Sequence, residues 1–183
     1  MPGPWATVRQ VHGATVAVVS SGGARAEEAD ALVCAVPGVP LACLAADCGL
    51  VGFSSPEGVI GVAHAGWRGL LDGVLEHTVA ELRRLGATRV TAVTSAMIHP
   101  ECYEFSPDDL DAAAQCFGDV VRSTTATGAP AFDLPAGLGE ALRRAEVEVV
   151  ASFGRCTRCE PGWFSARRGD RGRHALVVWR APA

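Results

Sequence analysis

The sequence predicts an α+β fold, in which strands outnumber helices. Short apolar runs recur along the chain and end at clusters of glycine, proline or serine, which is typical of strands. Helical spacing or capping signals occur in few places, and strands come in hairpins and in series. A regular βαβ alternation is therefore not predicted. We expect one domain over residues 1–183, because no linker or internal repeat interrupts the chain.

The first part of the chain predicts strands separated by turns. Thr15–Val19 is an apolar strand, and residues 20–29 read as a polar, turn-rich loop. Ala31–Val36 is a short apolar run that ends at a Pro-Gly pair, and Leu41–Ala46 is a candidate buried strand.

The segment Asp47–Gly69 predicts a β-hairpin. Two apolar runs, Gly49–Phe53 and Val59–Ala63, flank a cluster of turn-type residues. A loop centred on this cluster pairs position 48 with position 64 and sets Cys48 opposite His64. Opposed residues on antiparallel strands have Cβ atoms roughly 4.5–5.5 Å apart. A thiolate and an imidazole at that separation can share one metal ion.

Helices are predicted mainly after this hairpin. The first follows apolar spacing from Leu71 to Leu85, with Gly86 as its C-cap. The second begins at Ser106-Pro107, a strong capping signal, and the third covers residues 132–145. Three further strands are predicted at Arg89–Thr94, Val147–Ser152 and Ala175–Trp179. Residues 119–131 are predicted to form a loop, although Asp119–Arg122 could instead continue the preceding helix or form an edge strand.

The composition excludes several classes of protein. With 183 residues and 49% hydrophobic content, the chain can bury a substantial core. A formal net charge of −4 gives no broad basic surface for nucleic acid. No apolar run approaches the roughly 20 residues of a membrane span. The seven cysteines, without a signal peptide, indicate reduced thiols in a cytoplasm. We expect a cytoplasmic monomer without nucleic-acid or membrane partners.

Three side chains are candidate metal ligands, namely His12, Cys48 and His64. Two imidazoles and one thiolate leave one position of a tetrahedral zinc ion open, as in catalytic zinc sites. Only the pair of Cys48 and His64 follows from the hairpin register, because spacing alone does not bring His12 to them. The same pair leaves a second interpretation open, in which the thiol is a nucleophile and the imidazole its base. A buried structural thiol is the third alternative.

Charged residues around the hairpin also have alternative roles. Asp47 points to the other face of a regular strand, so it is a partner of a metal ligand, a general base or a structural carboxylate. Arg68 lies in a glycine-flanked turn and is either an anion ligand or part of a surface ion pair. The cluster of Arg167, Arg168 and Arg173 is either a phosphate or ribose contact or a solvated charge run.

Three further cysteines lie outside the hairpin. Cys156 and Cys159 have the spacing of a zinc knuckle or a redox motif, but a second CxxC is missing and no thioredoxin-like βαβ setting surrounds them. Cys102 follows His99 and Glu101 and is either a third thiol beside the site or a structural cysteine. We include Cys102 among the candidate substrate contacts.

These motifs resemble those of the laccase-domain family, also called the polyphenol oxidase or purine nucleoside phosphorylase group. They occur in the family's order and cover nearly all 183 residues. The matching motifs are Gln10-Val11-His12-Gly13, Ala46-Asp47-Cys48, His64-Ala65-Gly66-Trp67-Arg68-Gly69, Cys102-Tyr103-Glu104, Phe132-Asp133-Leu134, Cys156-Thr157, and Phe164-Ser165-x-Arg167-Arg168 with Gly172-Arg173.

The resemblance implies a four-layer α/β/β/α-type sandwich with mixed, largely antiparallel sheets, and one zinc ion bound by His12, Cys48 and His64. Copper is less expected, because a multi-copper oxidase needs many more histidines than five. The implied partners are a purine nucleoside and phosphate, through phosphorolysis of adenosine, inosine or methylthioadenosine and deamination of adenosine. Our candidate catalytic residues are Cys48, His64, Asp47 and Arg68, and our candidate substrate contacts are Arg68, Arg167, Arg168 and Cys102.

The chain also departs from the family's pattern. Family members usually carry several dozen residues before the Gln-Val-His-Gly block, and these help to form the pocket. Here the block lies near the first residue, so those pocket residues cannot be carried over. His99 and Glu101 replace part of an Ile-Gly-Pro block and would add polar groups near the metal. A Cys–His hydrolase and a truncated, non-catalytic binder of zinc or nucleoside therefore remain as alternatives.

Overall fold

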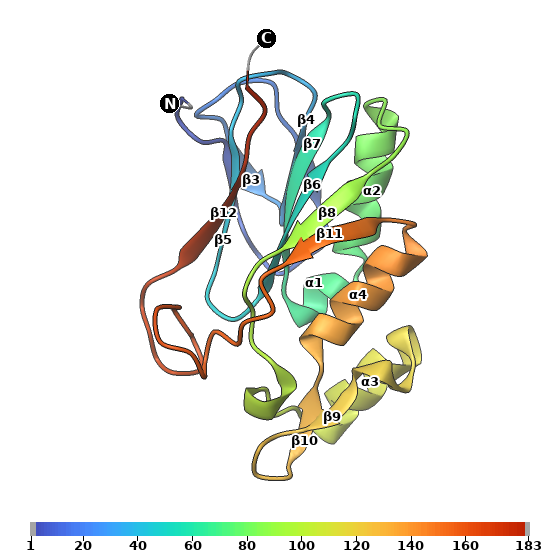
Figure 1. Cartoon of the computed structure of the whole chain (residues 1–183), viewed down its shortest axis with the longest axis vertical. Helices are drawn as coiled ribbons and strands as arrows, with labels where there is room; N and C mark the ends of the chain where they lie inside the picture. The colour runs from blue at the N-terminus through green and yellow to red at the C-terminus, as the bar shows by residue number, and fades with distance from the viewer. Residues whose placement is uncertain (1–2, 182–183) are drawn as a thin grey trace.

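A six-stranded sheet forms the centre of the computed structural model, which describes residues 3–181 (Figure 1). Its strand order is β11-β8-β6-β7-β4-β2. Strands β8, β6, β7 and β4 pair antiparallel, whereas β2 and β11 pair in parallel with their neighbours. The strands are β2 (Val16–Val18), β4 (Ala31–Cys34), β6 (Gly49–Ser54), β7 (Ile60–Ala65), β8 (Thr91–Thr94) and β11 (Glu148–Ser152).

A second layer of strands covers one face of this sheet. It contains β5 (Leu41–Ala45), which pairs antiparallel with β12 (His174–Val178), and β1 (Thr7–Arg9), which pairs in parallel with β3 (Arg25–Glu28). Between the layers lies an apolar core that includes Leu41, Cys43, Leu50 and Val62. This packing places the end of β5 next to the start of β6, where Cys48 lies.

Helices cover the opposite face of the sheet (Figure 1). The core on this side includes Phe53, Leu75, Leu82 and Leu142. None of the helices between residues 3 and 181 is both long and apolar enough to cross a bilayer. The helices on this face are α1 (Trp67–Leu71), α2 (Val74–Arg84) and α4 (Leu134–Arg144). Beyond the end of the sheet lie η1 (Pro100–Cys102), α3 (Pro107–Phe117), η2 (Asp119–Val121) and the hairpin of β9 (Arg122–Thr124) and β10 (Pro130–Phe132) (Figure 1).

The predicted α+β class with mixed, largely antiparallel sheets is confirmed. Five of the eight strand pairings are antiparallel. The helices, the six-stranded sheet and the β5–β12 layer form the α/β/β part of the predicted sandwich. Side chains alternate between the two cores along β6, because Leu50 faces the strand layer and Val51 faces the helices.

Two local predictions are wrong, and the start of one helix is shifted. Residues 20–29 contain β3, whose charged residues give no apolar pattern because three of its four positions are exposed. Residues 119–131 contain η2 and the β9–β10 hairpin rather than a loop. The predicted helix Leu71–Leu85 is found as α2, which begins three residues later, after Gly73, whose φ of 85° lies in the left-handed region and separates α2 from the short α1.

Candidate functional site

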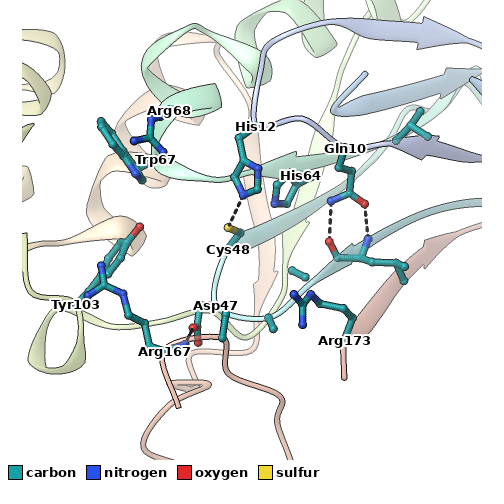
Figure 2. Close-up of a pocket in the computed structure, with 15 residues that line it drawn as sticks. Gln10, His12, Asp47, Cys48, His64, Trp67, Arg68, Tyr103, Arg167 and Arg173 are labelled. Atoms are coloured by element: carbon teal, nitrogen blue, oxygen red, sulfur yellow. Dashed lines mark hydrogen bonds between the residues drawn. The ribbon is translucent and has the colours of Figure 1, made fainter. Parts of the chain in front are cut away.

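The three candidate metal ligands meet at one end of the sheet. The ligand atoms of His12, Cys48 and His64 lie within 4.8 Å of one another (Figure 2). His12 Nε2 is 3.8 Å from Cys48 Sγ, and the two imidazole rings meet edge to face with centroids 4.8 Å apart. Since Zn–N and Zn–S bonds are about 2.0–2.3 Å long, one ion can lie within reach of all three atoms.

The hairpin positions two of these ligands, but in a different register from the predicted one. Leu50, not Cys48, pairs with His64. The reason is the loop, which runs from Ser55 to Val59 and is closed by a hydrogen bond from Ser55 N to Val59 O of 3.1 Å. The shift moves Cys48 by two positions and keeps it on the same face, as a diagonal neighbour of His64.

His12 reaches the site through a turn after β1. Its φ of 61° lies in the left-handed region, which is uncommon for residues other than glycine. The carboxylate of Asp30 holds this turn by accepting hydrogen bonds from the backbone N–H groups of Val11, His12 and Gly13, at 3.2, 3.0 and 2.7 Å. The geometry of His12 therefore depends on a residue that directly precedes β4.

Asp30 is a functional candidate that sequence reasoning missed. It is fully buried, and its Oδ1 lies 2.8 Å from His64 Nδ1. Burial raises the pKa of Asp30, but the hydrogen bonds from His64 and the backbone outweigh that effect and lower its pKa. A charged carboxylate only accepts hydrogen bonds, so Nδ1 of His64 donates and Nε2 is left for a metal. The sequence feature that could have indicated this role is an aspartate directly before an apolar strand, because a carboxylate is costly to bury unless it has hydrogen-bonding partners.

The surroundings of Cys48 favour its thiolate. Burial raises the pKa of Cys48, but contacts with His12 and His64 outweigh burial and lower the pKa to about 7. Burial lowers the pKa of His64, but Asp30 and Cys48 raise it to about 9. A Cβ atom built on Gly66 would lie 2.8 Å from His12 Cδ2 and 3.2 Å from Cys48 Sγ, so only glycine fits there. This tight set of two imidazoles and one thiolate fits a divalent metal such as zinc.

A pocket of about 670 Å³ opens over the three ligands (Figure 2). This volume lies in the range of roughly 300–1,000 Å³ that is typical of small-molecule sites. The guanidinium of Arg68 lies 4.5 Å from the centroid of Trp67, and that of Arg167 lies 5.0 Å from the centroid of Tyr103. Burial raises the pKa of Tyr103, so its phenol is neutral. Arg173 also lines the pocket, and its Nη1 donates to the carbonyl groups of Arg171 and Gly172 at 3.3 and 2.8 Å. The wall therefore offers two aromatic faces and three cations, of which Arg68 and Arg167 lie against the aromatic rings.

Gln10 is a second residue whose role was missed, because only its place in a motif was visible in the sequence. Its side-chain amide donates to Leu44 O at 2.7 Å and accepts from Leu44 N at 2.9 Å (Figure 2). These two bonds fix the segment before His12 against β5. Gln10 thus shapes the pocket wall through the backbone.

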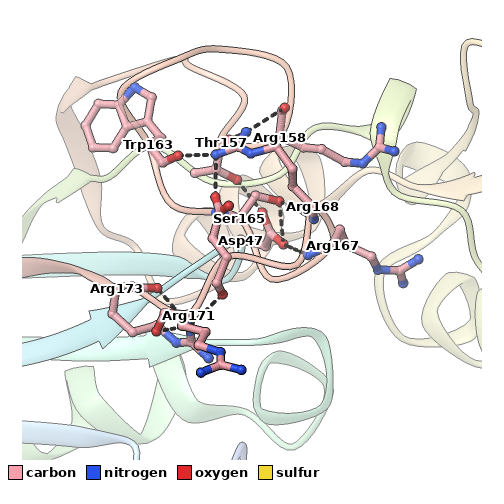
Figure 3. A network of polar contacts seen from close by, with 11 residues as sticks. Asp47, Thr157, Arg158, Trp163, Ser165, Arg167, Arg168, Arg171 and Arg173 are labelled. Carbon is pink, nitrogen blue, oxygen red and sulfur yellow. Dashed lines mark hydrogen bonds and ion pairs between the residues drawn. The ribbon is translucent and has the colours of Figure 1, made fainter.

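Asp47 lines the pocket but directs its carboxylate into a polar network (Figure 3). Its φ is 91°. Oδ1 accepts a hydrogen bond from Thr157 Oγ1 at 2.6 Å, and Oδ2 accepts from Ser165 Oγ at 3.1 Å and from Arg167 N at 2.8 Å. These contacts favour the structural-carboxylate alternative, because they anchor the loop that carries Arg167.

Arg168 is not brought into the pocket, so its predicted substrate contact needs correction. Its guanidinium donates to the carbonyl groups of Thr157 and Arg158 at 3.1 and 2.9 Å and to that of Trp163 (Figure 3). It also forms an ion pair of 2.5 Å with Asp170. Its donors are thus directed to its own loop, which they hold together.

Cys102 likewise does not line the pocket, and its Sγ lies 2.6 Å from Cys159 Sγ. His99 and Glu101 lie beside these thiols, since Glu101 Oε1 is 3.8 Å from His99 Nδ1 and 4.0 Å from Cys159 Sγ. The expectation that His99 and Glu101 add polar groups near His12, Cys48 and His64 therefore needs correction, because both residues lie beside the thiols of Cys102 and Cys159.

Comparison with known proteins gives consistent matches. A family model described as multi-copper polyphenol oxidoreductase laccase matches residues 1–181. The chain is 39% identical over 179 residues to a purine nucleoside phosphorylase of Streptomyces coelicolor, covering 94% of this chain and 73% of that protein. It is 33% identical over 178 residues to an adenosine deaminase of an unknown prokaryotic organism, covering 87% and 68%. The solved structure of the hypothetical protein YfiH of Bacillus licheniformis matches with a TM-score of 0.86 and 25% identity, covering 96% and 74%.

Proposed function

This chain belongs to the multi-copper polyphenol oxidoreductase laccase family, and we propose that it is an enzyme that acts on purine nucleosides with one bound zinc ion. The observation that carries the proposal is the convergence of His12, Cys48 and His64 beneath a pocket large enough for a nucleoside. The phosphorylase and deaminase names of the relatives support this substrate class. The chain has five histidines, which is too few for a multi-copper centre.

His12, Cys48 and His64 would hold the zinc ion, and Asp30 would fix the ring of His64. Three protein ligands leave a position open toward the pocket, as in catalytic zinc sites. Bound there, zinc supplies Lewis acidity and lowers the pKa of a bound water. The close packing of Gly66 against the imidazole of His12 and the thiolate of Cys48 keeps both side chains in place, so little reorganisation is needed when the metal binds.

Residues of the pocket wall would bind the purine ring and the phosphate. Trp67 and Tyr103 offer aromatic faces for a purine ring, and Arg68 and Arg167 offer cations for an anion. In phosphorolysis, a phosphate oxygen attacks C1′ of the ribose, and the bond from C1′ to N9 breaks as the purine leaves with its electron pair and gains a proton. In deamination, water adds at C6 of adenosine and ammonia leaves, which gives inosine.

A product assay tests this proposal. Zinc-loaded protein is incubated with adenosine, with and without phosphate, and the bases and nucleosides are separated by chromatography. We expect adenine that depends on phosphate, and inosine that does not. Cys48→Ser should abolish both products, and Cys116→Ser, which changes a thiol on α3, should keep both. A folded, zinc-loaded protein that forms neither product would contradict the proposal, and binding of inosine without turnover would select the non-catalytic alternative.

The Cys–His hydrolase, with Cys48 as nucleophile and His64 as base, remains a second candidate, because the side-chain atoms of these two residues lie within 4.8 Å of each other. His12 Nε2, which is 3.8 Å from Cys48 Sγ, offers a second imidazole for the role of the base. Alkylation with iodoacetamide at pH 7 separates the two functions. If zinc occupies the site, Cys48 is protected in the purified protein and reacts after the metal is removed by a chelator. A metal-free purified protein whose Cys48 reacts at once would favour the hydrolase.

A further inference from the structure

A second group of three thiols lies outside the pocket. The Sγ atoms of Cys102, Cys156 and Cys159 are within 4.8 Å of one another. Cys102 ends η1, and the other two lie on the segment that follows β11. Cys156 is buried, Cys102 is half-buried and Cys159 is exposed. The sequence alone contains only a CxxC, which is half of a common zinc-binding pattern, and the fold adds a third thiol to it.

The backbone holds the two segments side by side. Met97 N donates to Arg155 O at 3.1 Å, and Thr157 N donates to Met97 O at 3.1 Å. The backbone N–H of His99 donates to Cys156 Sγ at 3.4 Å. This hydrogen bond holds Cys156 next to the segment that leads into η1, and so brings it close to Cys102.

Charged groups surround the cluster in a way that suits a cation bound by thiolates. The guanidinium of Arg158 faces the thiol of Cys102 and offsets negative charge. Glu101 Oε1 lies 4.0 Å from Cys159 Sγ, where a carboxylate can complete a coordination shell. Structural zinc sites are closed by four protein ligands, commonly with a CxxC from one segment and further ligands from another.

We propose that Cys102, Cys156 and Cys159 bind a second zinc ion, with Glu101 beside the fourth position. Its role is structural, because the ion would tie η1 to the loop that begins at Cys156. Tyr103 follows η1 directly, and the anchor of Asp47 at Thr157 lies within that loop. A metal here would therefore fix two parts of the pocket wall. This inference goes beyond the proposed function and does not depend on it.

The alternative use of these thiols is a disulfide between Cys102 and Cys159, whose Sγ atoms lie 2.6 Å apart. A disulfide would leave Cys156 without a role and would remove the two thiolates that the metal needs. Two sulfurs that each lie about 2.3 Å from one tetrahedral zinc ion are farther apart than 2.6 Å, so the side chains of Cys102 and Cys159 must separate when the metal binds. The third thiol, the N–H donor and the guanidinium support the metal, and disulfide formation is an outcome that would overturn the proposal.

Metal content tests the proposal directly. The protein is purified and loaded with zinc under a phosphine reductant, excess metal is removed, and zinc per chain is measured by mass spectrometry. We expect two equivalents in the natural chain and in Cys116→Ser, and one equivalent in Cys102→Ser and in Cys159→Ser. An unchanged zinc content in both cluster variants would overturn the proposal, as would a disulfide between these two cysteines in the loaded protein.

A second measurement does not require the cluster variants to fold. Cys48→Ser removes the thiolate of the first site, so any sulfur-to-cobalt charge-transfer absorption in that variant must come from other cysteines. We expect Cys48→Ser loaded with cobalt(II) to show the intense absorption of a site with several thiolates. A spectrum without this absorption would contradict the second site, whatever the activity of the enzyme.

Discussion

The carboxylate of Asp30 accepts a hydrogen bond of 2.8 Å from Nδ1 of His64, and both side chains are buried. The same carboxylate accepts hydrogen bonds from three consecutive backbone N–H groups around His12. One residue thus sets the tautomer of one imidazole and the backbone of the other. The proposed metal centre would depend on Asp30 as well as on its own ligands, since partners of this kind orient ligands and tune their basicity.

Replacing Asp30 should weaken metal binding. An amide cannot accept all the hydrogen bonds that the carboxylate receives, so we expect Asp30→Asn to lower zinc affinity by about 10- to 100-fold. Unsatisfied N–H groups should also lower the free energy of unfolding by about 1–3 kcal/mol. Competition with a chromophoric chelator and thermal unfolding measure the two effects. Asp108→Asn, at an exposed position of α3, is the control, and an equal loss of affinity in both variants would contradict the role of Asp30.

A side chain at position 66 should disturb the metal centre directly. In Gly66→Ala, the new Cβ would lie 2.8 Å from His12 Cδ2 and 3.2 Å from Cys48 Sγ, so one of the ligands must move. We expect lower zinc affinity with little change in circular dichroism. Gly139→Ala is a matched control in α4, where a Cβ meets nothing within 4 Å, and it should raise stability by about 0.5–1 kcal/mol. Normal zinc binding by Gly66→Ala would contradict the role of close packing at Gly66 in holding His12 and Cys48.

Arg68 and Arg167, two of the three arginines that line the pocket, should affect phosphorolysis and spare deamination. Arg68→Gln and Arg167→Gln each remove a charged donor worth about 1.5–3 kcal/mol, so we expect the KM for phosphate to rise by about 10- to 100-fold. Phosphate-independent deamination should change little. Steady-state kinetics of both reactions provide the measurement, with Arg84→Gln on α2 as the control. If both reactions decline together, the arginines do not form a phosphate site.

Arg168 should behave differently from its neighbour. Because its guanidinium binds three carbonyl groups and Asp170, Arg168→Gln should lower the melting temperature and loosen the loop around Ser165. Hydrogen exchange of residues 157–170 and thermal unfolding measure this. A variant with normal stability and a raised KM for phosphate would instead place Arg168 in the substrate site.

Acid should remove a contribution of the β6–β7 loop to stability. The side-chain hydroxyl of Thr88 donates to Glu57 and lowers the pKa of Glu57 from 4.5 to about 2. Since the folded-state pKa is below the unfolded one, the contribution is present above pH 4.5 and is lost as the pH falls toward 2. Glu57→Gln should therefore melt below the natural chain at pH 7, with a gap that narrows toward pH 3. A gap independent of pH would contradict this linkage.

Those parts of the fold that depend on residues close together in the chain could be predicted from the sequence. The apolar runs of β6 and β7 and the cap of α3, where Ser106 Oγ accepts from Asp109 N, are properties of neighbouring residues. Strand β3 was missed because its order comes from pairing with β1, a partner distant in the chain. The hairpin register was wrong by two positions because Val59 can close a loop as readily as it can begin a strand.

The site was only partly predictable for the same reason. Cys48 and His64 share a hairpin, so their proximity is local. His12 and Asp30 lie in connections outside the hairpin, after β1 and before β4, and no spacing in the sequence indicates their contact. Cys102 meets Cys156 only through tertiary packing, which turned a weak CxxC signal into a cluster of three thiols.

Anomalous diffraction at the zinc edge tests the central claim most directly. Crystals of the zinc-loaded protein should show an anomalous peak about 2.0–2.3 Å from His12 Nε2, Cys48 Sγ and His64 Nε2, with one side open to the pocket. Loaded crystals without a peak among these three side chains would contradict a zinc centre at this site, and the enzymatic proposal with it.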